Sequence, residues 1–392
     1  SQVMHMLTVM IVGLAMGTTV TIAQAVGAGD KKRAARAVGN TVTLFGGISA
    51  LLTVVLLLLV RRITAVMSTP AEAVSGTVQY LTICFLGIPF ITAYNVLSSI
   101  FRGMGDSKSP MYFIAAACVV NIGLDFFFMG AFRLGPAGAA LGTTLSQAVS
   151  VLLALCVILK RRSIRLSKSD FCPRKATMKD ILSIGLPVAA QDGFIQVSFM
   201  LITIMANQRG LTDAAAVGIV EKIISFLFLV PSSMLSTVSA LGAQNIGAGK
   251  YDRTDDILRY AIAIGVGFGA VMALLMQFIA PSMVRPFTSD EAVVKAGAAY
   301  IRSYIFDCLF AGIQFSFSGY FCAYGKSGLS FLHNTLSILL VRVPGAYLAS
   351  KFFPQTLLPM GLASACGSLF SILVCVIAYH WLKRQQKAVL HG

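Results

Sequence analysis

The sequence predicts an all-α integral membrane protein built from two copies of one helical unit. Hydrophobic residues make up 57% of the 392 residues and charged residues only 12%, against about 25% charged in an ordinary soluble domain. Eleven apolar segments are long enough to cross a hydrocarbon core of about 30 Å as helices. A constant offset of 220 residues, as from Ala23 to Ala243, relates the two halves.

Each expected span is a mainly apolar segment of about 20 residues, the length that a helix rising about 1.5 Å per residue needs to cross a membrane. The first five belong to the first copy and the last six to the second. In chain order they are residues 4–27, 40–60, 77–101, 111–130, 137–159, 181–206, 214–240, 259–280, 297–322, 329–350 and 359–381.

The internal repeat is visible in two turns. The sequence AQAVGAGD at Ala23–Asp30 matches AQNIGAGK at Ala243–Lys250, and the same offset carries Phe101–Gly105 onto Phe321–Gly325. A single register held over so many residues indicates two copies of one structural unit.

The second copy contains one span, residues 181–206, whose partner in the first copy would fall before residue 1. We therefore expect eleven helices of a twelve-helix pattern in two six-helix lobes. Residues 1–159 form the amino-terminal lobe (helices 2 to 6), 160–180 a cytoplasmic linker and 181–392 the carboxy-terminal lobe (helices 7 to 12). Because six is even, both copies enter the membrane in the same orientation, and an axis along the membrane normal relates them.

The net charge of +16 does not indicate a nucleic-acid partner, because the basic residues alternate between loops instead of forming one patch. One set of alternate loops is rich in Lys and Arg, and the other set holds only seven. Two of these seven, Arg61 and Arg62, are adjacent and are the one local objection to placing the richer set in the cytoplasm. The positive-inside rule makes the richer set cytoplasmic, and we expect a multi-pass protein of the plasma (inner) membrane with a cytoplasmic carboxy terminus. That set holds 21 of the 31 Lys and Arg, in segments 31–36, 102–108, 160–179 and 250–259, at Lys326 and in the tail 383–387.

The eight cysteines never form a C-x-x-C pair, and the four histidines are scattered without metal-ligand spacing. Neither a disulfide framework nor a zinc site is indicated, and no cofactor is expected. A membrane-embedded enzyme would need a catalytic His, Ser or Cys constellation, or a carboxylate metal pair, at matching depth. The sequence offers none, and we do not expect an enzyme.

Four of the fifteen acidic residues lie within expected spans: Asp125, Asp192, Glu221 and Asp307. A charge at the bilayer centre costs about 2.5 to 3.5 kcal/mol on insertion scales, and such residues are functional candidates by default. Glu221 is followed by Lys222 and is interpreted as one half of a neighbouring pair.

Asp125 is the strongest of these candidates. Asn121 lies four residues earlier and therefore on the same helix face, and Thr143 lies at a similar depth on the next span at about 1.5 Å per residue. A carboxylate, an amide and a hydroxyl supply oxygen ligands for Na⁺, and the carboxylate can instead take a proton. The alternative is a polar cluster that only holds two helices together.

Asp192 follows Gln191 near the middle of its span, where Pro187 can bend the helix toward a cavity. Asp307 occupies the place of Gly87 in the first copy, and this asymmetry indicates a role particular to one lobe. Both are candidates for a substrate cavity.

A static ion pair is an equal alternative for both acids. The available bases are Arg302, Lys222 and Arg342. We expect some aromatic residues to line the cavity as well, from the group Phe194, Phe199, Phe226 and Phe315.

The doubled unit, the A-Q-x-x-G-A-G turn in each half and the sequence RGMGDSKSP at Arg102–Pro110 together resemble the multidrug and toxic compound extrusion (MATE) transporters, particularly the bacterial kind. In that family, N-x-x-x-D on the fifth helix with an alanine and a threonine four apart on the sixth is the cation site of the amino-terminal lobe. Asn121, Asp125, Ala139 and Thr143 match this pattern. The family's first helix supplies a further aspartate, and that helix is not within this sequence.

The resemblance implies a secondary active antiporter that exports small organic, often cationic compounds in exchange for H⁺ or Na⁺ by alternating access. Its partners would be these compounds and membrane lipids, and a monomer is expected. A lipid-linked oligosaccharide flippase of the same superfamily is the alternative. It would need arginines in its cavity to hold pyrophosphate, whereas the spans here offer acids.

Overall fold

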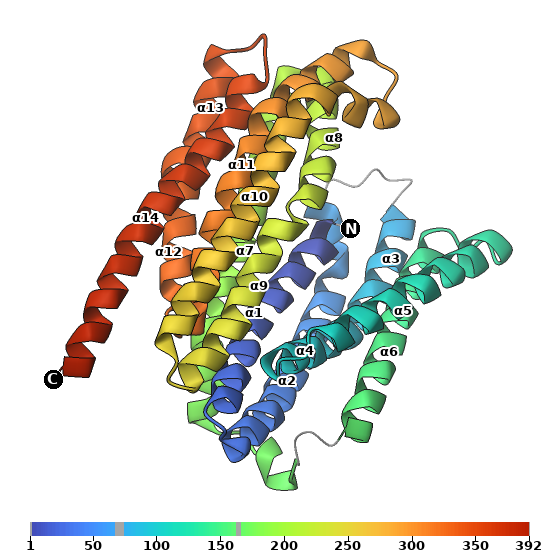
Figure 1. Ribbon diagram of the computed structural model, residues 1–392. Helices are drawn as coiled ribbons and strands as arrows, with labels where there is room; N and C mark the ends of the chain where they lie inside the picture. Colours follow the sequence, from blue (N-terminus) through green and yellow to red (C-terminus); the bar gives the residue numbers. More distant parts are fainter. Residues whose placement is uncertain (1, 67–73, 162–165, 392) are drawn as a thin grey trace. The chain divides into compact units, whose positions relative to one another are not determined.

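The computed structural model describes residues 2–66, 74–161 and 166–391, and every regular element in them is a helix (Figure 1). This confirms the all-α prediction. The chain folds as two compact units, Ser1–Gly185 and Leu186–Gly392.

The first unit contains six α-helices, the two short helices η2 and η3, and the beginning of a seventh α-helix, which continues into the second unit. These are α1 (Gln2–Gly27), α2 (Lys31–Val66), α3 (Val74–Leu86), α4 (Ile88–Gly103), α5 (Lys108–Asp125) with the π-helix η2 (Phe126–Ala131), α6 (Pro136–Arg161), the short η3 (Lys168–Phe171) and α7 (Lys175–Arg209). The core lies between α1, α2, α4 and α6, where Ile22, Phe45 and Phe101 are buried together.

The second unit is arranged around one long buried helix, α11 (Glu291–Ala323), which packs against α8, α9, α10, α12 and α14. The other elements are α8 (Leu211–Leu227), α9 (Leu229–Gly247), α10 (Tyr251–Val284), η4 (Arg285–Phe287), α12 (Ser327–Ser337), η5 (Ile338–Arg342), α13 (Val343–Phe352) and α14 (Leu358–His391). Small residues let the helices approach closely. Gly265 of α10 lies against the backbone of Gly312 of α11, and a Cβ there would be 2.8 Å from Gly312 Cα.

Within the described residues, nine helices are long and apolar enough to span a membrane, and the pair α3 and α4, bent by 42° at Gly87, makes a tenth. The eleventh expected span, 329–350, is helical throughout as α12, η5 and α13. It is more polar than the others because it carries the buried groups His333, Asn334 and Arg342.

The sequence repeat is also a repeat of local structure. Gly29 and Gly249, which are equivalent by the 220-residue offset, both adopt a φ of +71°, a left-handed conformation that favours glycine at the end of a helix. Thr19 Oγ1 donates to the Ser99 carbonyl at 3.3 Å. The equivalent bond, from Ser239 Oγ to the Gly319 carbonyl, has the same length.

Part of the segment expected as a linker is fixed on α2 by the buried Asn40. Its Nδ2 donates to the Asp170 carbonyl at 3.0 Å, and its Oδ1 accepts from the Arg174 amide at 2.7 Å. The Ser167 amide and hydroxyl each donate to Asp170 Oδ2 at 2.9 Å. These bonds favour the charged carboxylate and lower the pKa of Asp170.

Arg209 joins three chain segments at one end of the second unit. Its side chain is only 6% exposed, and its Nε bonds Asp213 at 2.6 Å. The four remaining N–H groups reach carbonyls of the last turn of α13 and of the segment between α13 and α14. These carbonyls belong to Ser350, Phe353, Pro354 and Thr356.

Replacing Arg209 with lysine should lower the stability of the second unit by at least about 2 kcal/mol, because an ammonium cannot reproduce the planar fork and hydrogen bonds to charged groups are worth about 1.5 to 3 kcal/mol each. The measurement is the thermal midpoint of the purified protein in detergent. Arg285→Lys is the matched control, since Arg285 and Glu291 form a pair in which both side chains are more than half exposed. Equal midpoints for the two variants would contradict the role given to Arg209.

Candidate functional site

Asp125 and Asn121 lie on the last turn of α5, directly before the π-helix η2. A π-helical turn within an α-helix is uncommon and often marks a functional site. Both side chains are partly buried. Being four residues apart, they share the face of α5 that packs against α6.

Gly142 of α6 is the residue against which this pair lies. A Cβ at Gly142 would overlap Asp125 Oδ1 and would be 3.5 Å from Asn121 Nδ2. Both of these polar atoms are buried, and neither has a hydrogen-bond partner among the described residues. An unsatisfied buried polar group costs about 1 to 3 kcal/mol. A proton or a cation on the carboxylate would remove that cost for Asp125.

Thr143 is not brought to this pair by the structure. Its side chain is exposed, and its Oγ1 donates to the Ala139 carbonyl of its own helix at 3.0 Å. Consecutive residues of a helix point about 100° apart because one turn takes 3.6 residues. The face of α6 that carries Gly142 therefore meets Asp125, and the face with Thr143 does not. Ala139 is only partly buried and contributes a carbonyl to Thr143.

Gly142 provides a test that separates the site from the fold. In Gly142→Ala the new methyl group would displace the tip of Asp125, a side-chain atom that can move at little cost to stability. On the ion-coupling role that the resemblance implies for Asp125, we expect normal expression and thermal midpoint but reduced transport. Gly123→Ala on α5 is the control, because a Cβ there meets no atom within 4 Å. Equal transport by both variants would show that the position of Asp125 is unimportant.

Gln191 is fully buried in α7, and its Oε1 accepts a hydrogen bond from Ser330 Oγ of α12 at 2.5 Å. The neighbouring Asp192 is partly buried and forms no ion pair with any described residue. Phe194 is 39% exposed and packs edge to face on Phe331 with ring centroids 5.7 Å apart. Gln191 and Phe194 thus link α7 to α12 within the second unit.

Asp307 forms a buried ion pair with Arg342, one of the three bases considered above. Arg342 Nη2 lies 2.9 Å from Asp307 Oδ2, and the two side chains are 9% and 0% exposed. The same nitrogen donates to the Tyr304 hydroxyl at 2.7 Å, and the guanidinium lies over the Phe199 ring at 5.3 Å. Of the two remaining aromatic candidates, Phe315 is partly buried on α11 and Phe226 is exposed on α8.

Glu221 accepts a hydrogen bond from Thr203 of α7 at 3.0 Å, and Lys222 is exposed. The bond across to α7 differs from the neighbouring pair that the sequence indicated. The three acids expected within spans of the second unit therefore sit in different environments. Of Asp192, Glu221 and Asp307, only Asp307 has a basic partner among the described residues.

A buried histidine network was missed from the sequence. His333 of α12 is fully buried, and its two ring nitrogens contact Ser318 of α11 at 2.9 Å and Ser371 of α14 at 2.6 Å. The three residues are far apart along the chain, and no local spacing could reveal them. In the described part of the chain, no group of three or more His, Cys, Asp or Glu could hold a metal ion.

Comparison with known proteins gives consistent results. The sequence pattern of the MatE family matches residues 1–127 and 187–348. The probable multidrug resistance protein YpnP of Bacillus subtilis (strain 168) is 29% identical over 95% of this chain and 83% of its own length. The probable multidrug resistance protein NorM of Thermotoga maritima is 24% identical over 100% of this chain and 85% of its own.

Solved structures show the same fold. A crystal structure of MATE in complex with MaL6 superposes with a TM-score of 0.90 at 21% identity, covering 99% of this chain and 87% of that one. An outward-facing multidrug resistance MATE family transporter of the MOP superfamily also reaches 0.90 at 21% identity, covering 99% and 86%. The long helices, the repeat and the two units described above are thus those of a known transporter fold.

Proposed function

The chain belongs to the MatE family, a family of membrane transporters and not of enzymes, and from this premise we propose that it is a secondary active antiporter. It would export small organic, mainly cationic compounds from the cell in exchange for H⁺ or Na⁺. The names of its relatives, multidrug resistance proteins, support the substrate class.

One observation carries the coupling step: the buried, unpartnered Oδ1 of Asp125 beside Asn121 and Gly142. A driving ion can shift a conformational equilibrium only by binding the two states with different affinity. A carboxylate oxygen without a hydrogen-bond partner gains most from a bound proton or cation. We therefore propose Asp125 with Asn121 as the coupling site. Thr143 would contribute only indirectly, as part of α6, the helix that carries Gly142.

The carboxylate allows both coupling ions. Carboxyl groups within membrane spans can take up and release protons, which suits H⁺, whereas carboxylate and amide oxygens also suit a hard cation such as Na⁺. We propose no further cofactor. In the second unit, Asp192 beside Gln191 and Phe194 is our candidate for contact with a cationic substrate.

We further propose that residues 1–159 and 181–392 act as the two lobes of an alternating-access transporter, joined by residues 160–180. The protein would work as a monomer in the plasma (inner) membrane of a bacterium, with its basic loops and its carboxy terminus in the cytoplasm. A cysteine placed at Lys168, with the native cysteines removed, should then not react with an impermeant thiol reagent added outside intact cells.

A lipid-linked oligosaccharide flippase is not favoured by any observation. It would need arginines free to bind pyrophosphate, and Arg342 of the second unit is already paired with Asp307.

The decisive test is drug efflux from proteoliposomes holding the full-length protein, with a pH gradient and a Na⁺ gradient imposed separately. We expect ethidium transport under one of the two gradients and none without a gradient. Equal transport with and without any gradient would refute antiport.

A further inference from the structure

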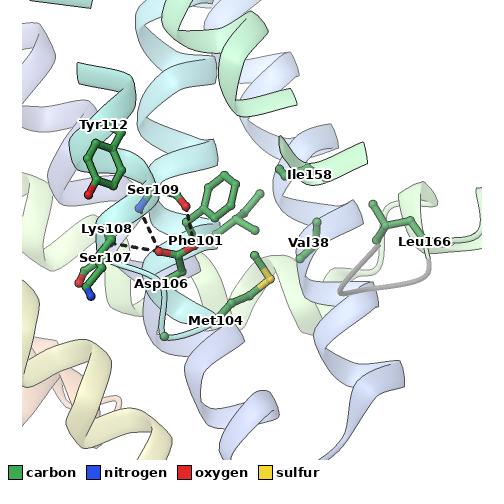
Figure 2. Close-up of a pocket in the computed structure, with 12 residues that line it drawn as sticks. Val38, Phe101, Met104, Asp106, Ser107, Lys108, Ser109, Tyr112, Ile158 and Leu166 are labelled. Atoms are coloured by element: carbon green, nitrogen blue, oxygen red, sulfur yellow. Dashed lines mark hydrogen bonds between the residues drawn. The ribbon is translucent and has the colours of Figure 1, made fainter. Parts of the chain in front are cut away.

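A cavity of about 620 Å³ lies in the first unit where α4 ends and α5 begins (Figure 2). Its walls come from α2, α4, α5, α6 and the segment after α6. The lining residues are Val38, Ile100, Phe101, Met104, Gly105, Asp106, Ser107, Lys108, Ser109, Tyr112, Ile158 and Leu166.

The lining is divided into a polar side and an apolar side. Figure 2 shows Ser107, Lys108 and Tyr112 on one side and Val38, Ile158 and Leu166 on the other. Ile100, Phe101 and Met104 add to the apolar part. A ligand that matches this surface has a polar head and a hydrocarbon part.

The polar side of the cavity carries a positively charged side chain, that of Lys108. The Asp106 carboxylate is already used at the start of α5, where it accepts from the amides of Lys108 and Ser109 at 3.1 and 3.0 Å and from the Ser109 hydroxyl at 2.6 Å. Lys108 is exposed, and no described carboxylate forms an ion pair with it. The basic segment 31–36 directly precedes the lining residue Val38 on the same helix, α2, which favours a negatively charged head.

The internal repeat indicates that the second unit packs differently at the equivalent place. At the positions equivalent to Ile100 and Met104, the second unit has Tyr320 and Tyr324, whose rings lie 4.9 Å apart. Tyr320 also donates to Asp255 at 2.8 Å and packs 5.5 Å from Tyr379. The second copy therefore has large aromatic rings at the two positions where the first copy has the smaller side chains of Ile100 and Met104.

Part of the polar rim is also absent from the second copy, although Ser107 is retained there as Ser327. The positions equivalent to Lys108, Ser109 and Tyr112 are Gly328, Leu329 and Leu332. Lys108, Ser109 and Tyr112 thus have no polar counterpart in the second copy, although the turn itself is common to both, with Gly105 and Gly325 at φ of +89° and +70°.

We propose that this cavity binds an anionic phospholipid of the surrounding membrane. The cavity lies at the ends of membrane-spanning helices, where headgroups are found, and basic pockets between such helices are suited to anionic headgroups. The phosphate would contact Lys108 and the Tyr112 hydroxyl, and the upper part of one acyl chain would lie against Ile100 and Met104. The proposal does not depend on the transport activity.

The test is native mass spectrometry of the full chain in detergent, titrated with phosphatidylglycerol or with phosphatidylcholine. We expect one tightly retained phosphatidylglycerol. Met104→Tyr, which copies the second unit, should abolish its retention. Lys108→Gln should weaken it about fivefold, the ratio that corresponds to about 1 kcal/mol per lysine at an anionic surface. Lys326→Gln, in the equivalent turn of the second unit, is the matched control and should bind as the wild type does.

Three results would overturn the proposal. Equal retention of phosphatidylcholine would remove the role of charge. Equal affinity for glycerol 3-phosphate would make this a phosphate site and not a lipid site. Full retention of phosphatidylglycerol by a folded Met104→Tyr protein would place the lipid elsewhere. If that variant does not fold, the same measurement is made on Lys108→Gln and Tyr112→Leu, both at exposed positions. Full retention by both of these variants would likewise place the lipid elsewhere.

Discussion

Replacing Asp125 with asparagine should reduce gradient-driven export to the level of cells without the transporter while leaving the amount of folded protein unchanged. Asparagine has nearly the same shape as aspartate, and the small space over Gly142 is preserved. It cannot take up a proton or neutralise a cation, however. The ion would then no longer distinguish the two conformations of the protein, and the gradient could not drive export.

The measurement should compare ethidium efflux from proteoliposomes under a pH gradient and under a Na⁺ gradient, together with equilibrium drug binding. We expect drug binding to persist in Asp125→Asn, because no substrate contact is assigned to this residue. Thr143→Val is the matched control, since the Thr143 hydroxyl is exposed and bonds only its own helix. Transport by Asp125→Asn at the wild-type rate would make the pair structural and would pass the coupling role to Asp192 or Asp307.

The sequence was sufficient to predict features that depend on local periodicity. Asn121 and Asp125 are four residues apart on one helix, and their shared face follows from helical geometry. The turns at Gly29 and Gly249 follow from the repeat, because identical sequence at equivalent positions adopts the same φ. The spans follow from hydrophobic length.

Features that depend on the rotation of a helix about its own axis could not be predicted in this way. Thr143 and Gly142 are adjacent and at nearly equal depth, yet Gly142 lies against Asp125 while the Thr143 hydroxyl bonds its own helix. The depth of each residue along its span therefore indicated that α5 and α6 meet, but it did not indicate which residue of α6 contacts Asp125. A glycine on the facing helix was the available signal, because close helix packing in membranes uses small residues.

Contacts between distant segments were equally hidden. The sequence offered three bases as partners for Asp307, and only the folded structure, in which Arg342 of η5 reaches Asp307 of α11, selects Arg342. The cavity near Met104 arises from differences between the copies, whereas the repeat predicts their similarity. Comparing equivalent positions, such as Met104 with Tyr324, shows where the units must pack differently.

Removing Arg342 should be the most destabilising single change within the second unit. In Arg342→Met the Asp307 carboxylate, which is 0% exposed, would lose its basic partner. Breaking a buried ion pair in this way costs about 3 to 5 kcal/mol, because an uncompensated charge remains in a medium of low polarity. We expect a large fall in the thermal midpoint of the protein in detergent.

The double variant Asp307→Asn/Arg342→Met should recover most of that loss, since replacing both partners of a buried pair by neutral groups is often nearly neutral for stability. Removing the exposed pair Arg259 and Asp256, with side chains 78% and 56% exposed, is the control and should change the midpoint little. An unchanged midpoint in Arg342→Met alone would contradict the structural role of the pair. Transport by the stable double variant then separates two functions: wild-type efflux would make the pair purely structural, and lost efflux would show that Asp307 takes part in the transport cycle.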